Sequence, residues 1–352
     1  MYTIDELLEK AAEMKASDLH LTVGVPPKVR VFGELISIDG PKLMPKDLHD
    51  LAYSILPETQ INRFEENGEL DFSYSIPKIG RYRANVYHQR GSLAVTIRLV
   101  GEQIPTPDKL GVPDSVRELI HKRRGLVLVT GPTGSGKSTT LASLVDMINE
   151  QYAYNIITLE DPVEYLHPHK RSIVNQREVG TDTRSFSAAL TSALREDPDV
   201  ILVGEMRDID TISTAITAAE TGHLVFSTLH TIGAASTIDR IIDVFPPYQQ
   251  GQIRSQLSLV LEGVISQQLI PMTGNRGRKA AFEVMLATPA IRNLIREGKT
   301  HQIAGSMQTA KKAGMQTMDD AIFELYVNRY IDREQAVGYA QDPVALSNRM
   351  FM

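Results

Sequence analysis

Short apolar runs alternate with stretches of helical periodicity through the middle of the chain. The runs at 125–130, 155–159, 199–203 and 224–227 are mostly apolar, and apolar residues recur at three- and four-residue steps between them. Fully buried strands of a parallel sheet have this continuous apolar character, and strands that alternate with helices are typical of an α/β sheet. The pattern therefore predicts a parallel α/β domain, followed by a mostly helical region from Pro289 onward.

The first hundred residues have a different pattern. Apolar residues at helical spacing predict a helix near Ile4, and alternating stretches at 18–23, 28–32, 82–87 and 93–99 predict strands. The last two strands are separated by Gln89-Arg90-Gly91, which favours a hairpin. The polar stretch GEQIPTPDKLGVP, rich in proline and glycine, follows at 101–113. We predict an α+β domain at 1–100, a linker at 101–113, an α/β core at 114–288 and a helical C-terminal region at 289–352.

Composition narrows the classes of function. Hydrophobic residues make up 42% and charged residues 23% of the chain, which excludes wholesale disorder. The chain has no cysteine, so disulfides, thiolate zinc sites, iron–sulfur clusters and cysteine nucleophiles are excluded. The formal net charge of -6 and the absence of tryptophan disfavour nucleic acid as the main partner. The N-terminus MYTIDELLEK carries acidic residues where a secretory signal would carry basic ones, and we expect a cytoplasmic protein.

The strongest local signal is a phosphate-binding loop. Residues 131–138 read GPTGSGKS and match G-x-x-x-x-G-K-[ST] between a predicted strand and a predicted helix. Glycines let the backbone wrap closely around an anion, and the amides of the helix N-terminus point at it. We expect Lys137 to neutralise the β- and γ-phosphates and Ser138 to hold Mg²⁺. The predicted nucleotide-binding residues are Gly131, Pro132, Thr133, Gly134, Ser135, Gly136, Lys137, Ser138 and Thr139.

Carboxylates follow two of the predicted core strands. Glu205 comes just after 200–203, at the sheet edge where α/β folds bind ligands, and is a candidate metal-holding residue. Glu160, Asp161 and Glu164 follow another strand, and one of them could activate the attacking water. Glu164 is favoured and Glu160 is the second candidate, although a solvated acidic turn around Pro162 explains the same residues.

Histidines and arginines add weaker candidates. His230 follows the strand at 224–227 and could report the nucleotide state, although a histidine at a strand end is more often structural. His167 and His169 flank a proline, and two imidazoles without a third ligand favour a surface turn over a metal site. Arg83 and Arg98 lie on opposing strands of the predicted hairpin, as part of a solvated face or of an anion-binding patch.

Taken together, the motifs resemble the secretion ATPase superfamily. GPTGSGKS, ITLEDPVEY (157–165), LREDPDVILVGEMRD (194–208) and GHLVFSTLHT (222–231) are similar to its Walker A, Asp-box, Walker B and His-box motifs, in that order. ASDLH at 16–20 fits the same superfamily, and AIRNLIRE at 290–297 resembles its type IV pilus retraction branch. The tetracysteine zinc motif that is usual in the assembly and secretion branches is absent, since the chain has no cysteine.

The resemblance implies a homohexamer whose subunits pair an N-terminal PAS-like domain with a RecA-like ATPase domain. It implies ATP and Mg²⁺ as ligands, pilus retraction as the work done, and an inner-membrane platform protein as partner. Glu164 would be the catalytic carboxylate, Glu205 the Walker B carboxylate and His230 the His-box residue. Arg83 and Arg98 would reach the γ-phosphate. The alternatives are a RecA-like nucleic-acid translocase, a pilus assembly or type II secretion ATPase, and a hexameric adaptor that binds nucleotide without hydrolysing it.

Overall fold

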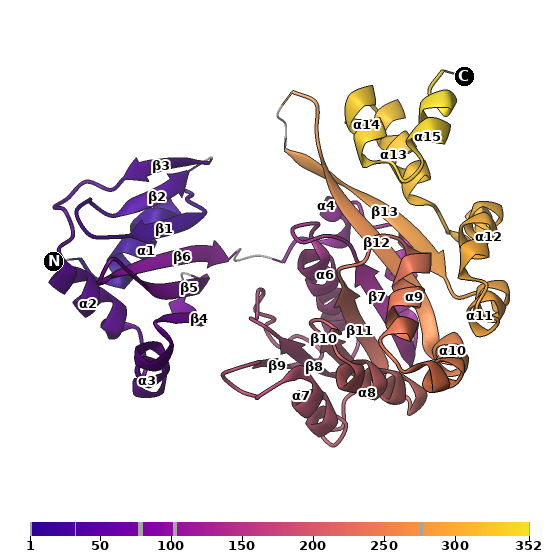
Figure 1. The fold of residues 1–352 in the computed structure, drawn as a ribbon, viewed down its shortest axis with the longest axis horizontal. Coiled ribbons are helices and arrows are strands. Elements are labelled where there is room, and N and C mark those ends of the chain that lie inside the picture. Colours follow the sequence, from indigo (N-terminus) through magenta and orange to yellow (C-terminus); the bar gives the residue numbers. More distant parts are fainter. Residues whose placement is uncertain (1, 32, 77–79, 101–103, 275–276, 352) are drawn as a thin grey trace. The chain divides into compact units, whose positions relative to one another are not determined.

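The computed structural model describes residues 2–31, 33–76, 80–100, 104–274 and 277–351 (Figure 1). The chain forms two compact units, which are described separately. One comprises Met1–Gln103 together with Pro162–Leu166, and the other comprises Ile104–Asp161 and His167–Met352. Among the described residues, no helix is both long and apolar enough to cross a membrane.

The N-terminal unit is a six-stranded sheet in the order β3-β2-β1-β6-β5-β4, with antiparallel pairing throughout. Its first helix begins with a capping box between Thr3 and Glu6, and it buries the apolar face that the sequence predicts. The elements are α1 (Ile4–Glu13), β1 (Asp18–Leu21), β2 (Lys28–Val31), β3 (Glu34–Ser37), α2 (Pro45–Ser54), α3 (Glu58–Asn67), β4 (Glu69–Ile76), β5 (Gly80–Gln89) and β6 (Ser92–Val100).

The predicted hairpin is present as β5 and β6. Arg90 and Gly91 connect the strands with φ values of 50° and 73°, the left-handed conformation that matches the twist of a tight hairpin. The register places Arg83 directly opposite Arg98. Because directly opposed residues of a sheet share a face, the two guanidinium groups lie on the same side.

The second unit contains a seven-stranded sheet in the order β13-β12-β7-β11-β10-β8-β9 (Figure 1). The four predicted core strands are β7, β8, β10 and β11, and all pair in parallel. The elements up to the last strand are α4 (Pro107–Leu110), α5 (Asp114–Arg117), η1 (Glu118–His121), β7 (Gly125–Thr130), α6 (Lys137–Gln151), β8 (Asn155–Glu160), β9 (Ile173–Glu178), α7 (Phe186–Ala193), β10 (Val200–Val203), α8 (Ile209–Glu220), β11 (Leu224–Leu229), α9 (Ala234–Asp243), α10 (Pro247–Val260), β12 (Leu261–Pro271) and β13 (Arg278–Leu286).

The second unit contains features that the sequence pattern did not predict, among them the edge strand β9. β12 and β13 form an antiparallel pair, and β12 joins the parallel sheet beside β7. The helix α4 lies within the expected linker at 101–113, of which residues 101–103 lie outside the described part, as does Phe32 of a predicted strand.

The C-terminal region is helical, as the sequence pattern predicts. Its last three helices pack around a small apolar core that includes Met318, Ile322 and Leu346, while Ile291 and Ile303 of the earlier helices belong to the larger core of the sheet. The elements are α11 (Pro289–Arg296), η2 (Thr300–Gln302), α12 (Ile303–Thr309), η3 (Lys311–Ala313), α13 (Met318–Val327), α14 (Arg333–Tyr339) and α15 (Pro343–Arg349).

A buried carboxylate on β13 joins this region to the sheet. Glu283 is 5% exposed and accepts hydrogen bonds from the backbone N–H groups of Ala234 (2.6 Å) and Met318 (3.3 Å). Ala234 is the first residue of α9 and Met318 is the first residue of α13, so one side chain caps two helices. Gln341 Nε2 donates a third hydrogen bond, at 3.1 Å. Burial raises the pKa of Glu283, while these hydrogen bonds act in the opposite direction.

Ion pairs of Asp320 make the C-terminal region sensitive to acid. Lys311 Nζ and Arg349 Nη1 lie 2.8 Å and 2.7 Å from Asp320 Oδ1, and Thr317 donates to Oδ2. Burial opposes ionisation, but these contacts outweigh it and lower the pKa of Asp320 to about 2. Since this value lies below that of the unfolded chain, the stabilisation is complete above about pH 4 and is lost as the pH falls toward about 2.

We therefore expect Asp320→Asn to lower the melting temperature at neutral pH. The difference from the unmodified protein should close as the pH falls through this window, because protonation removes the same charge. Thermal melts over a series of pH values measure it. A difference that stays constant between about pH 4 and about pH 2 would contradict the assignment.

Candidate nucleotide site

The phosphate-binding loop connects β7 to α6. Gly131, Gly134 and Gly136 have φ values of 140°, 78° and 89°, a conformation that residues with a side chain rarely adopt. A Cβ atom on Gly131 would lie 2.2 Å from the backbone oxygen of Gln267. Glycine is therefore required at 131 by space as well as by conformation, and the loop has the tight curvature that phosphate binding needs.

Lys137 is the first residue of α6 and folds back over the loop. Its ammonium group donates to the carbonyl oxygens of Gly131 (2.9 Å) and Pro132 (3.1 Å). The side chain is 8% exposed, while Ser138 beside it is exposed. The loop thus places the ammonium group of Lys137 and the exposed hydroxyl group of Ser138 at the N-terminus of α6, where anions bind favourably.

Gln267 on β12 braces this loop, although it belongs to none of the motifs that the sequence shows. Its Nε2 donates to the backbone oxygen of Ser135 (2.7 Å), and its Oε1 accepts from Thr140 Oγ1 (2.8 Å). The side chain is 3% exposed. The available signal was the polar pair Gln267-Gln268 inside an otherwise apolar run, because buried amides normally have a hydrogen-bonding role.

We expect Gln267→Ala to weaken nucleotide binding by about tenfold, because the loop loses the side chain that fixes Ser135 and Thr140. Titration with a fluorescent nucleotide measures the affinity. Gln302→Ala, at an exposed glutamine of the C-terminal region, is the matched control. An unchanged affinity in Gln267→Ala would show that the loop keeps its shape without the brace.

Glu205 and His230 follow neighbouring strands and come together in the structure. β10 and β11 pair in parallel, so the segments after Val203 and Leu229 meet at the same edge of the sheet. Glu205 Oε2 lies 3.3 Å from His230 Nε2 and 2.7 Å from Arg207 Nε. A pocket of about 340 Å³ lies beside this pair and is also lined by Arg240.

The Asp-box carboxylates have separate environments. Glu160 ends β8, where its Oε1 accepts from Thr158 Oγ1 (2.6 Å) and Gln176 Nε2 (3.1 Å). Glu164 is exposed and belongs to Pro162–Leu166, which groups with the N-terminal unit. Glu160 is therefore held by structural hydrogen bonds, while the carboxylate of Glu164 faces solvent.

Arg83 and Arg98 form a pair of like charges on one face of the N-terminal sheet. Arg98 Nε lies 2.9 Å from Asp18 Oδ1, and Arg83 Nε lies 3.9 Å from Asp71 Oδ1. Burial opposes ionisation of Asp18, but hydrogen bonds from Ser17 and Arg98 outweigh it and lower the pKa of Asp18. Asp18 and Asp71 therefore offset the repulsion between the two directly opposed guanidinium groups.

The two histidines around Pro168 differ in their burial. His169 is exposed, as a surface turn predicts. The same prediction is wrong for His167, which is buried against α6 beside Asp146.

Comparison with known proteins relates the whole chain to secretion ATPases. The family model described as type II/IV secretion system protein matches residues 95–333. The type IV pilus retraction ATPase PilT of Pseudomonas aeruginosa is 50% identical over 97% of this chain and 98% of its own length. A twitching motility protein of Neisseria gonorrhoeae is 44% identical over 98% of this chain and 92% of its own length.

A solved structure shows the same fold. The crystal structure of the pilus retraction motor PilT with bound ADP matches with a TM-score of 0.94 and 52% identity, and the match covers 99% of this chain and 100% of that one. The predicted fold class is thereby confirmed, with an N-terminal sheet domain, a RecA-like ATPase domain and a helical C-terminal region.

Proposed function

The chain belongs to the type II/IV secretion system protein family, and we propose that it is the ATP-hydrolysing motor of type IV pilus retraction. The observation that carries the proposal is the similarity to a pilus retraction ATPase along nearly the whole of both chains. The phosphate-binding loop supports the ATPase part, since Gly131, Gly134 and Gly136 have the positive φ values of a tight loop and the ammonium group of Lys137 lies against it.

In the proposed site, ATP binds to the loop 131–139, with its phosphates on the backbone amides at the start of α6. Lys137 exchanges its carbonyl contacts for the β- and γ-phosphates. Ser138 and Glu205 supply the hard oxygen ligands that suit Mg²⁺, which neutralises phosphate charge when it is bound. Glu205 exchanges its ion pair with Arg207 for this role.

We assign the remaining chemistry to residues that the motifs single out. Glu164 orients and deprotonates the attacking water, and His230 senses the γ-phosphate through its contact with Glu205. Arg83 and Arg98 stabilise the charge that develops on the γ-phosphate, as paired guanidinium groups suit phosphate geometry. The proposed assembly is a homohexamer at the cytoplasmic base of the pilus, working on an inner-membrane platform protein.

Deletion of the gene in its host, together with ATPase assays of the purified protein, tests this function. We expect long pili that do not retract and loss of twitching motility, with Mg²⁺-dependent phosphate release in vitro. Cells without pili would indicate an assembly ATPase instead. DNA-stimulated hydrolysis with salt-dependent DNA binding would indicate a translocase. Nucleotide binding without any phosphate release would indicate an adaptor.

Arg292 of α11 tests whether the AIRNLIRE segment couples hydrolysis to work. Its guanidinium group donates to the carbonyl oxygens of Ser258 (2.9 Å) and Leu259 (2.7 Å) and to Glu262 Oε1 (2.8 Å). It thus ties α11 to the end of α10 and the start of β12. Leu261 at this point pairs with Leu126 near the start of β7, whereas the phosphate loop follows the end of β7 at Thr130.

We expect Arg292→Ala to keep ATP turnover within about twofold while retraction fails, because its contacts anchor α11 and none touches the nucleotide loop. Phosphate release and twitching are measured on the same variant, with Arg296→Ala at the end of α11 as the neighbouring comparison. Equal loss of both activities would contradict a coupling role.

A further inference from the structure

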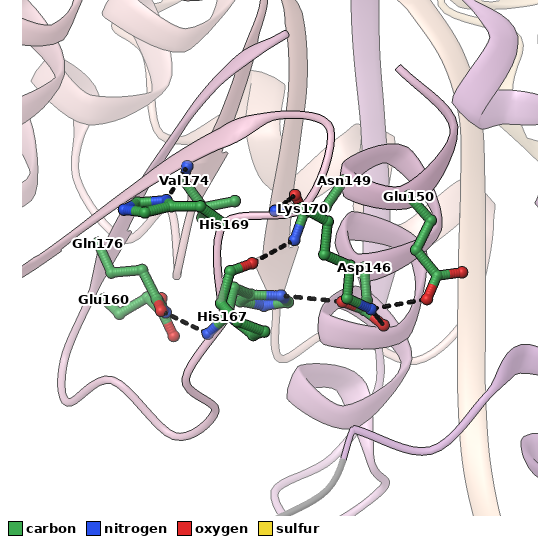
Figure 2. Close-up of polar contacts among 10 residues, drawn as sticks. Asp146, Asn149, Glu150, Glu160, His167, His169, Lys170, Val174 and Gln176 are labelled. Atoms are coloured by element: carbon green, nitrogen blue, oxygen red, sulfur yellow. Dashed lines mark hydrogen bonds and ion pairs between the residues drawn. The ribbon is translucent and has the colours of Figure 1, made fainter. Parts of the chain in front are cut away.

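A polar network connects the second half of α6 to the chain that follows β8 (Figure 2). Its members come from α6, from the segment 167–170 and from β9, and all lie in the second unit. We call it the His167 network and define it by Asp146, Asn149 and Glu150 of α6, His167 and Lys170 of the following segment, and Gln176 of β9.

Gln176 ties together the two ends of the segment 161–166. Its Nε2 donates to Glu160 Oε1 (3.1 Å), and its Oε1 accepts from the backbone N–H of His167 (2.8 Å). Gln176 is itself fixed, because β9 pairs with β8 and places it opposite Thr158. Gln176 therefore holds together Glu160 and His167, the residues that come just before and just after this segment, which carries Glu164.

His167 comes directly after the segment 161–166, and its side chain connects this end of the segment to α6. Its side chain is only 2% exposed, and its Nδ1 lies 3.9 Å from Asp146 Oδ1. Both atoms are buried and have no hydrogen-bond partner among the described residues. Buried polar groups are normally satisfied, so an imidazole and a carboxylate that face each other in this way call for a functional explanation.

The rest of the network favours the charged form of the Asp146 carboxylate and holds the backbone of Pro168 and Lys170 against α6. Lys170 Nζ lies 2.9 Å from Asp146 Oδ2 and 2.7 Å from Glu150 Oε1. Burial opposes ionisation of Asp146, but its contacts with His167 and Lys170 outweigh burial and lower its pKa. Asn149 donates to the carbonyl of Pro168 (2.7 Å) and accepts from the N–H of Lys170 (3.1 Å).

We propose that His167 is a positioning residue, which fixes the segment carrying Glu164 to the helix that begins at Lys137. α6 is a continuous helix from the phosphate loop to the network, so a contact at Asp146 is transmitted rigidly to Lys137. His167 does not touch the nucleotide in this proposal, and it acts through the placement of Glu164. The inference rests on the proposed function, in which Glu164 activates the attacking water.

The first experiment compares three variants in steady-state ATP hydrolysis. His167→Ala removes the contact with Asp146, and we expect kcat to fall about tenfold while KM for ATP stays within about twofold. His167→Asn keeps a donor near the position of Nδ1 and should restore kcat to within about threefold of the unmodified protein. His169→Ala removes an exposed imidazole from the same turn, together with the hydrogen bond that its Nδ1 accepts from the N–H of Val174 (3.1 Å), and should leave kcat unchanged.

A double-mutant cycle separates positioning from general damage to the fold. If His167 acts through Glu164, His167→Ala should lower kcat in the unmodified protein but add little in a Glu164→Gln background. Losses that multiply in the double variant would overturn the proposal. So would a loss in His167→Ala that His167→Asn fails to restore.

Hydrogen exchange of the nucleotide-free protein provides a readout that does not depend on turnover. We expect backbone amides in 161–171 to exchange faster in His167→Ala than in His169→Ala, with 137–143 unchanged. Unchanged exchange in 161–171 would overturn the proposal even if the protein hydrolyses ATP. An unmodified protein that releases no phosphate would instead refute the proposed function, and the exchange comparison would still decide whether His167 holds the segment.

Discussion

Lys137→Ala is expected to abolish ATP turnover, with a loss in kcat/KM of about a hundredfold or more. Lys137 is the only charged side chain within the phosphate-binding loop 131–139, and it is mostly buried with its ammonium group against the loop carbonyls. Its removal takes away the charge that stabilises the transferring phosphoryl group, and it leaves the carbonyls of Gly131 and Pro132 without this donor. Phosphate release over a range of ATP concentrations up to saturation measures kcat and kcat/KM.

The matched control for this variant is Lys312→Ala, at an exposed lysine of the C-terminal region. It makes the same change of charge and should keep turnover within about twofold, since surface charges away from the site contribute little. If Lys137→Ala retained more than about a tenth of the activity, the loop would not be the hydrolytic site.

Glu205→Gln is expected to preserve nucleotide binding and to slow hydrolysis by about a hundredfold or more. The amide keeps the shape of the side chain but removes the charge that pairs with Arg207 and His230 and that would hold the metal. Binding of a fluorescent nucleotide and single-turnover hydrolysis measure the two quantities separately.

Asp239→Asn is the control for Glu205→Gln, because it neutralises an exposed carboxylate on α9. We expect both its binding and its hydrolysis to match the unmodified protein. A Glu205→Gln protein that hydrolyses ATP at the normal rate would leave Glu205 with a structural role beside His230.

The central sheet was predictable because its strands are buried on both faces and therefore read as continuous apolar runs. β12 was harder to recognise because Ser266, Gln267 and Gln268 interrupt its apolar pattern. Two of these polar residues are buried because they have hydrogen-bond partners from distant parts of the chain. Ser266 accepts from the N–H of Gly233, and Gln267 braces the phosphate loop. Such pairing depends on strand order, which the sequence does not contain.

The candidate site was predictable to the extent that its chemistry is local in sequence. The phosphate-binding loop is a contiguous motif, and the strand-end positions of Glu205 and His230 followed from the apolar runs before them. Their direct contact depends on β10 and β11 being neighbours in the sheet. The burial of His167 was not predictable, because it depends on Asp146, which lies one helix earlier in the chain.

The shared capping of α9 and α13 by Glu283 has a mechanical consequence. α9 starts shortly after His230, and α13 belongs to the C-terminal helices. Separating the two helix ends would strip a buried carboxylate of hydrogen bonds, which costs more than a typical surface rearrangement. A small displacement of α9 near the His box should therefore move α13 and the other C-terminal helices with it, because Glu283 keeps the ends of α9 and α13 together.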